Sequence, residues 1–179
     1  IGARDAEVKL TSWNIGEHKG EIIIGKYSLI TPGVRIMAAE KIKIGDACMI
    51  AHGVYISDAD WHGIYDRSEP VGQTKPVILE DNVWVGDSAI ICKGVTIGKN
   101  SIIGAGAIVT KDVPQNSIFA GNPAKLVKEL NDEEFNTRKD FFKDPKKLAH
   151  DFDMLDKYTL KDNTFLNWLK SIIYPDDTH

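Results

Sequence analysis

The stretch that decides the fold is PVILEDNVWVGDSAIICKGVTIGKNSIIGAGAIVTKDV, residues 76–113. Large aliphatic residues recur in it at every sixth position, namely at Leu79, Val85, Ile91, Ile97, Ile103 and Val109. Smaller or β-branched residues stand two positions before each of them, at Val77, Val83, Ala89, Val95, Ser101 and Ala107. Because residues two apart face the same side of a strand, each block turns one large and one small side chain inward.

The short blocks are separated by turns. Gly86, Gly98 and Gly104 each follow a large aliphatic residue, where the chain must turn sharply. Three blocks close a coil of about eighteen residues, and stacked coils form a solenoid with a continuous core. An antiparallel β protein is the alternative, but its strands are spaced by about eight to twelve residues. The fixed interval therefore predicts an all-β solenoid, without giving the hand of its coil.

The repeat extends toward the amino terminus and is interrupted once. Regular blocks begin at Ile24, and their phase slips by two between Ala38 and Lys43, which an insertion at one corner explains. The pattern stops for residues 57–75 and resumes in phase at Val77. Loops longer than about 12–15 residues are uncommon and often functional. This excursion loop is polar and carries Trp61 and His62.

The segments VILEDNVWVGDSAIICKGVTIGKNSIIGAGAIVTKDVP and SIFAGNPAKLVKEL resemble the hexapeptide-repeat acyltransferases, specifically the maltose, galactoside and polysaccharide O-acetyltransferase group. The resemblance covers about residues 22–130 and rests on NVWVG, GAGAIVTKD and AGNPAK in the expected order around one histidine-bearing insertion. It implies a left-handed parallel β-helix, a homotrimer, and acetyl-CoA as the acyl donor, with no metal.

Length, charge and composition limit the number of domains, the kinds of binding partner and the cellular compartment that we expect. The 179 residues suffice for one main domain with an appendage, and a net charge of −4 argues against a nucleic-acid partner. No apolar run approaches the ~20 residues of a spanning helix, and no signal peptide opens the chain. Cys48 and Cys92 are expected to pack as free thiols, which together with a CoA substrate favours the cytoplasm.

We expect three regions. Residues 1–21 form an amino-terminal cap or remnant, in which Trp13 and Ile15 cover the open end of the solenoid. Residues 22–130 form the β-helix with its excursion loop, and residues 131–179 form a helical extension. Since the sequence opens on Ile1 rather than methionine, acceptor-binding residues could precede it.

Three helices are expected in the extension. Asn131 with Glu134 has the form of a helix N-cap, and Pro145 is placed to start a second helix. The third, over residues 164–174, has an apolar face. Only Lys170 is basic there, so packing against the coil or a neighbouring subunit is favoured over a membrane surface.

One histidine is singled out by the resemblance. His62 matches the catalytic histidine of the family. We expect His52 to be a corner residue that is less favoured than His62 to contact the substrate. The other histidines are expected to be solvated or terminal: His18, His150 and His179. An imidazole suits the removal of an alcohol proton near neutral pH. Asp58, Asp60 or a backbone carbonyl would orient the ring. No nucleophile is required, so we expect direct attack in a ternary complex.

The donor-binding residues are also carried over from the resemblance. Trp84 matches the tryptophan at the thioester, although plain packing at a corner is its alternative, and Ala105 matches the residue whose backbone meets pantetheine. Thr110 and Lys111 correspond to a pair at the nucleotide end. Lys125 and Lys128 match basic positions that meet the CoA phosphates, where relatives often carry arginine. The resemblance further implies that His62 and Trp84 of one site come from different subunits.

Other functions stay open at this point. A zinc enzyme that hydrates carbon dioxide would need three histidine ligands, and the coils supply only His52 and His62. A non-catalytic scaffold is a third class. The acceptor is expected to be a hydroxyl of a sugar or polysaccharide, with an antibiotic or an amino group as the alternative. Thr31 stands where simple-sugar relatives carry an asparagine.

Overall fold

The computed structural model describes residues 7–131, 134–161 and 163–173. The chain divides into two compact units, Ile1–Lys139 and Asp140–His179. The first unit holds every strand that the structure describes: β1 (Lys9–Ser12), β2 (Asn14–Ile15), β3 (His18–Lys19), β4 (Glu21–Ile24), β5 (Leu29–Ile30), β6 (Arg35–Ala38), β7 (Lys41–Ile44), β8 (Met49–Ile50), β9 (Tyr55–Ser57), β10 (Val77–Leu79), β11 (Trp84–Val85), β12 (Ile90–Ile91), β13 (Thr96–Ile97), β14 (Ile102–Ile103), β15 (Ile108–Val109), β16 (Ser117–Ala120) and β17 (Lys125–Glu129).

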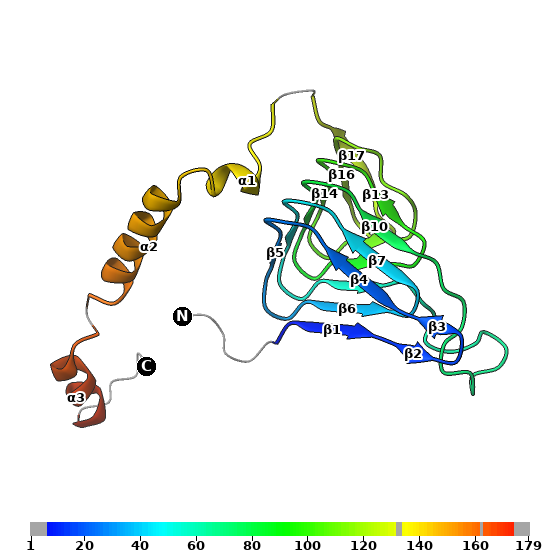
Figure 1. The fold of residues 1–179 in the computed structure, drawn as a ribbon, viewed down its shortest axis with the longest axis horizontal. Coiled ribbons are helices and arrows are strands. Elements are labelled where there is room, and N and C mark those ends of the chain that lie inside the picture. Colours follow the sequence, from blue (N-terminus) through cyan, green and yellow to red (C-terminus); the bar gives the residue numbers. More distant parts are fainter. Residues whose placement is uncertain (1–6, 132–133, 162, 174–179) are drawn as a thin grey trace. The chain divides into compact units, whose positions relative to one another are not determined.

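Strands β4 to β15 visit three sheets in turn, which are the three sides of a coil (Figure 1). We call them the β4 sheet (β4, β7, β10, β13), the β5 sheet (β5, β8, β11, β14, β16, β17) and the β1 sheet (β1, β6, β9, β12, β15). Strands of successive coils pair in parallel, as Val77 with Ile42 and Ile91 with Val109 do. The fold is therefore the parallel β solenoid that the six-residue interval predicts.

The core consists of the two residue series that the sequence pattern marks as inward. Leu79, Ile91 and Ile97 are fully buried, and so are the smaller Ala89 and Ser101. All twelve positions of the two series are at most 1% exposed. Each large side chain lies in register with its counterpart in the next coil, as Val85 does with Ile103. Stacking of this kind gives the coils one continuous hydrophobic core.

The glycines that follow the large aliphatic residues are not needed for the turns, as the sequence predicted, but for another structural reason. Gly86 and Gly98 are not in the left-handed region; Asn82, Ser88 and Asn100 are, with φ of +57°, +55° and +61°. A Cβ at Gly86 would lie 2.7 Å from the backbone nitrogen of Ala105 in the next coil. These glycines are therefore required by the close approach of stacked coils, and the turn itself falls two residues later.

The amino-terminal residues join the coil instead of only covering its end. Strand β1 pairs in parallel with β6, and β2 and β3 form an antiparallel hairpin. Trp13, which the sequence placed over the open end, lies between β1 and this hairpin, with its ring centroid 5.7 Å from that of Trp61. The amino-terminal hairpin is thereby attached to the excursion loop.

The helices of the structure are α1 (Arg138–Phe141), α2 (Pro145–Thr159) and α3 (Phe165–Ile173). Helix α2 begins at Pro145 as predicted, and the Asp144 side chain caps it by accepting from the backbone N–H groups of Lys146 and Lys147. The helix expected directly after Asn131 is wrong, because residues 134–137 are not helical. Arg138 donates from Nε to the carbonyl oxygen of Tyr27 and so fastens this segment to the coil unit. No helix among the described residues is long and apolar enough to cross a membrane.

Candidate active site

The excursion loop leaves the coil between β9 and β10, and its base is fixed by Asp58. This carboxylate is fully buried and accepts from the backbone N–H of Ala39, at 2.8 Å, and of Glu40, at 2.9 Å. The N–H of Lys75 donates to the Asp58 carbonyl oxygen, which closes the loop at its other end. Asp58 is thus occupied as an anchor of the loop and of the corner at residues 39–40, so the expectation that it orients His62 is wrong.

Replacement of Asp58 by alanine is predicted to destabilise the fold strongly, because it leaves two backbone N–H groups without their acceptor. We expect the free energy of unfolding to fall by about 3 kcal/mol, since hydrogen bonds to a charged group are worth about 1.5–3 kcal/mol each. Asp60→Ala is the matched control and should cost less than about 1 kcal/mol, as its ion pair is partly exposed. Urea denaturation measures both; equal losses would contradict the anchoring role.

The residues just before His62 are held by polar and aromatic contacts. The Asp60 carboxylate pairs with Nζ of Lys93 at 2.5 Å, so it too is engaged away from His62. The indole N–H of Trp61 donates to the hydroxyl of Tyr55 at 2.9 Å. The guanidinium of Arg35 lies 4.8 Å from the centre of the Tyr55 ring. These contacts fix the loop on the outer face of the β1 sheet up to the residue that precedes His62.

His62 lies, along the loop, between two residues that line different cavities, and it is not itself among the residues that line either one. It is exposed, and its ring has no hydrogen-bond partner among the described residues, so it is free to meet a substrate. Trp61, one residue earlier, lines a cavity of about 460 Å³, which we call the sheet cavity, with Tyr55, Cys92 and Lys93 among its other walls. Gly63, one residue later, lines a second cavity.

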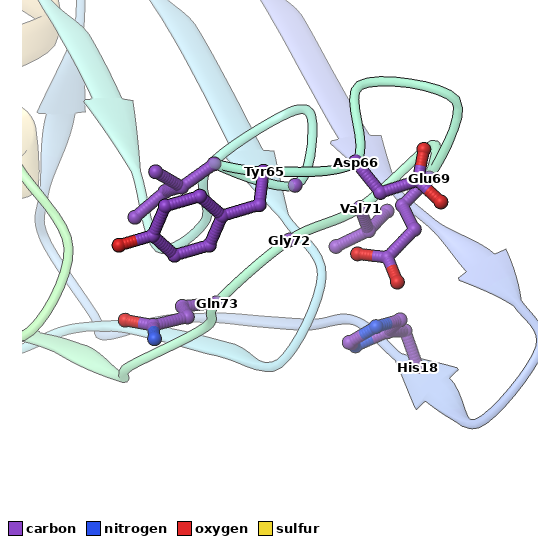
Figure 2. Close-up of a pocket in the computed structure, with 9 residues that line it drawn as sticks. His18, Tyr65, Asp66, Glu69, Val71, Gly72 and Gln73 are labelled. Carbon is purple, nitrogen blue, oxygen red and sulfur yellow. The ribbon is translucent and has the colours of Figure 1, made fainter.

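This second cavity, which we call the hairpin cavity, measures about 520 Å³ (Figure 2). Its walls come from the excursion loop and from the β2–β3 hairpin: His18, Gly63, Ile64, Tyr65, Asp66, Glu69, Val71, Gly72 and Gln73. The sequence pattern did not single out these side chains, and it read His18 as solvated. The loop's length and polarity were a signal for its half of the cavity, whereas nothing in the pattern brought the hairpin beside it.

The predicted donor-binding residues fall into two groups. Trp84 lies on β11 in the β5 sheet, 46% exposed, and it points outward because Val83 and Val85 on either side are fully buried. Lys125 and Lys128 are exposed on β17, at the end of the same sheet. In a three-sided coil this sheet faces away from the corner between the β1 and β4 sheets, from which the excursion loop leaves.

Of the other predicted donor residues, Thr110 and Lys111 share the corner of the loop, whereas Ala105 lies at another corner. Thr110 and Lys111 follow β15 and are exposed, and the register of β12 with β15 places them one coil beyond Cys92 and Lys93. Ala105 is exposed at the corner between the β5 and β1 sheets, between β14 and β15. One chain therefore presents Trp84 and the paired lysines on a different side from His62.

Both cysteines are poor nucleophiles. Burial raises the pKa of the Cys48 thiol to about 11, and its Sγ lies 3.1 Å from the carbonyl oxygen of Glu80. Burial also raises the pKa of Cys92, and the charge of Lys93 only partly offsets this. Thiols with raised pKa values stay protonated near neutral pH, which disfavours a covalent acyl-enzyme at either residue.

The remaining histidine of the coils lies apart from His62. His52 follows β8, at the corner between the β5 and β1 sheets, and its Nδ1 lies 2.8 Å from the carbonyl oxygen of Pro32. Within the described part of the chain, no group of three or more His, Cys, Asp or Glu side chains is arranged to hold a metal ion.

The sequence matches a known protein family and several curated proteins. Residues 76–111 match the family described as bacterial transferase hexapeptide (six repeats). A galactoside O-acetyltransferase of Escherichia coli K12 is 37% identical over 127 residues, which are 70% of this chain and 61% of the relative. The chain spans less than two thirds of the length of the curated relatives that it matches first.

Two solved structures share the fold. A hexapeptide-repeat acetyltransferase of Vibrio cholerae, in complex with acetyl-CoA, is 29% identical with a TM-score of 0.58 over 70% of each chain. A polysialic-acid-specific acetyltransferase is 34% identical with a TM-score of 0.56, over 74% of this chain and 63% of its own. The chain is thus a hexapeptide-repeat protein, similar to O-acetyltransferases of sugars and polysaccharides.

Proposed function

We propose that the protein is an acetyl-CoA-dependent O-acetyltransferase that modifies a hydroxyl of a sugar or polysaccharide, with His62 as the general base. The observation that carries the proposal is the position of His62: an exposed imidazole without a hydrogen-bond partner among the described residues, on the excursion loop of a hexapeptide-repeat coil and next to Trp61 and Gly63, which each line a cavity. The acetyl-CoA-bound Vibrio relative and the galactoside O-acetyltransferase relative support the donor and the class of acceptor. A reducing compartment such as the cytoplasm suits this donor.

The reaction needs one proton acceptor and no covalent intermediate. An acceptor hydroxyl gives its proton to a ring nitrogen of His62 while its oxygen attacks the thioester carbonyl carbon. The carbon–sulfur bond then breaks, and the CoA thiolate leaves and takes up the proton. The raised pKa values of Cys48 and Cys92 support this direct route over a thiol nucleophile.

The proposal includes a left-handed coil and a homotrimer in which each site is shared. The excursion loop of His62 leaves the coil at the corner between the β1 and β4 sheets, whereas Trp84 lies on the β5 sheet, which supports a site that takes the two residues from different chains. A closed ring of three identical subunits supplies such a pairing three times, and closed cyclic symmetry is usual for homo-oligomers. Thr110 and Lys111 would then contact CoA from the chain that provides His62, and Ala105, Lys125 and Lys128 would complete the groove.

Titration calorimetry with acetyl-CoA, followed by measurement of released thiol across a panel of sugars, tests the function. We expect acetyl-CoA to bind at micromolar to millimolar concentration and thiol release to depend on a sugar. Absence of binding at millimolar concentration would overturn the enzyme assignment and leave a non-catalytic solenoid. Release that depends on an amine or an antibiotic instead would overturn the acceptor class.

Three exposed lysines are predicted to bind the nucleotide end of the donor. Alanine at Lys111, Lys125 or Lys128 should raise the KM for acetyl-CoA by roughly three- to tenfold and leave a short acyl-pantetheine donor unaffected, because only CoA carries the phosphates. Raising the salt concentration should mimic the substitutions. Lys43→Ala is the control, because Lys43 is exposed on β7 in the β4 sheet, a sheet that carries none of the three lysines. Equal losses with both donors would place the lysines outside the nucleotide site.

A further inference from the structure

We infer that the hairpin cavity is the acceptor subsite and that it selects uncharged sugars over anionic ones. The inference rests on the proposed function, because it names the class of the acceptor whose hydroxyl proton His62 is proposed to take. It uses side chains of the excursion loop and of the β2–β3 hairpin that were not predicted as site residues.

The first argument is the position of the cavity. A direct transfer requires donor and acceptor to be bound at the same time, on either side of the base. The sheet cavity contains Cys92 and Lys93, which precede Thr110 and Lys111 by one coil along the loop corner, so it lies toward the donor residues. The hairpin cavity begins at Gly63, on the other side of His62 along the loop, and His18 of the amino-terminal hairpin lines it, so it is placed to receive the acceptor.

The second argument is the contact between the cavity and His62. A Cβ at Gly72 would lie 2.4 Å from the carbonyl oxygen of His62, so the two strands of the loop touch there. A Cβ at Gly63 would lie 2.5 Å from Oε2 of Glu69, which places this carboxylate against the residue that follows His62. A ligand that binds Glu69 is therefore held beside the backbone of the loop at Gly63, one residue after the proposed base.

The third argument is the chemistry of the walls. Tyr65 is fully exposed and Ile64 is 62% exposed, and they offer apolar surface to the C–H face of a sugar ring. Gln73 lies beside Tyr65, whereas the Glu69 carboxylate points toward His18 on the opposite side (Figure 2). Amide, carboxylate and imidazole groups beside these apolar side chains match the hydroxyl groups of a sugar.

The fourth argument is charge. The walls that the structure describes carry two carboxylates, Asp66 and Glu69, and no lysine or arginine. The hydroxyl and backbone N–H of Ser68 donate to Asp66 at 2.6 and 2.9 Å and lower the pKa of that carboxyl, so it stays ionised. An acceptor with its own carboxylate would meet this negative charge unpaired, whereas an uncharged sugar would use it as a hydrogen-bond acceptor.

The test is the ratio of kcat/KM for methyl β-galactoside to that for a methyl sialoside, with the full chain, saturating acetyl-CoA and about 0.01 M salt. We expect the galactoside to be preferred at least about tenfold. The double variant Asp66→Asn, Glu69→Gln should reduce this ratio by about tenfold, as like-charge repulsion is removed. Glu17→Gln, which removes the same charge from the hairpin outside the cavity, should leave the ratio within about twofold.

Two results would overturn the inference: a preference for the sialoside, or a ratio that the double variant leaves unchanged. If neither sugar is acetylated, the proposed function fails, and saturation-transfer NMR of the two sugars then decides the inference by binding alone. His62→Ala separates the two claims, because it should abolish turnover and keep the galactoside signal. A galactoside signal that Tyr65→Ala and Gln73→Ala both leave intact would also overturn the acceptor subsite.

Discussion

His62→Ala is expected to lower kcat by 10²- to 10⁴-fold, the usual contribution of general-base catalysis. The ring is exposed on the excursion loop and has no hydrogen-bond partner among the described residues, so its removal breaks no hydrogen bond in that part of the chain. The KM for acetyl-CoA should stay within a few-fold, because the donor residues lie elsewhere. Steady-state kinetics of thiol release measure both quantities.

His52→Ala is the matched control for this prediction. His52 contacts the Pro32 carbonyl at a different corner of the coil, so its loss should change kcat by no more than a few-fold. A fully active His62→Ala protein combined with an inactive His52→Ala protein would transfer the role of base to His52. Circular dichroism of both variants distinguishes a lost base from a lost fold.

The second large effect is expected when inactive variants are mixed. His62→Ala and Trp84→Ala chains, each nearly inactive alone, should regain about one quarter of the wild-type activity after they are unfolded together and reassembled at random. The reason is geometric: His62 leaves the coil at one corner, and Trp84 lies on the opposite sheet. A site that takes one residue from each of two chains finds both intact in about one arrangement of four.

Reassembly of wild-type chains with the double variant His62→Ala, Trp84→Ala is the control. A shared site predicts about one quarter of the activity in this mixture as well, whereas a site within one chain predicts about one half. Mass spectrometry of the intact assemblies establishes that mixed trimers have formed. No recovery from the two single variants, together with one half from the control, would place both residues in one chain.

The coil was predictable because its core obeys one local rule. Leu79 and Ile97 are buried for the same reason, an inward position in a six-residue block, and that rule can be read from spacing alone. The role of Gly86 could not be predicted from spacing, because it depends on how closely the backbone of Ala105 in the next coil approaches the backbone of Gly86. The pairing of β1 with β6 joins distant segments and leaves no periodic trace.

The site was predictable only in part. The interruption of the repeat marked the loop of His62, but the partners of Asp58 and Asp60 are Ala39, Glu40 and Lys93, which lie at other levels of the coil. Polar contacts of this kind depend on the corner geometry. The spacing of residues therefore located the loop, and the contacts within it required the structure.

Incubation of a neutral glycoside with acetyl-CoA that carries a ¹³C-labelled acetyl group tests the central claim most directly. We predict that NMR and mass spectrometry detect one labelled acetyl ester on a sugar hydroxyl for each CoA thiol released, with wild-type protein and not with His62→Ala. CoA release without a labelled ester, or an ester formed equally well by His62→Ala, would contradict the assignment of the protein as a sugar O-acetyltransferase with His62 as its base.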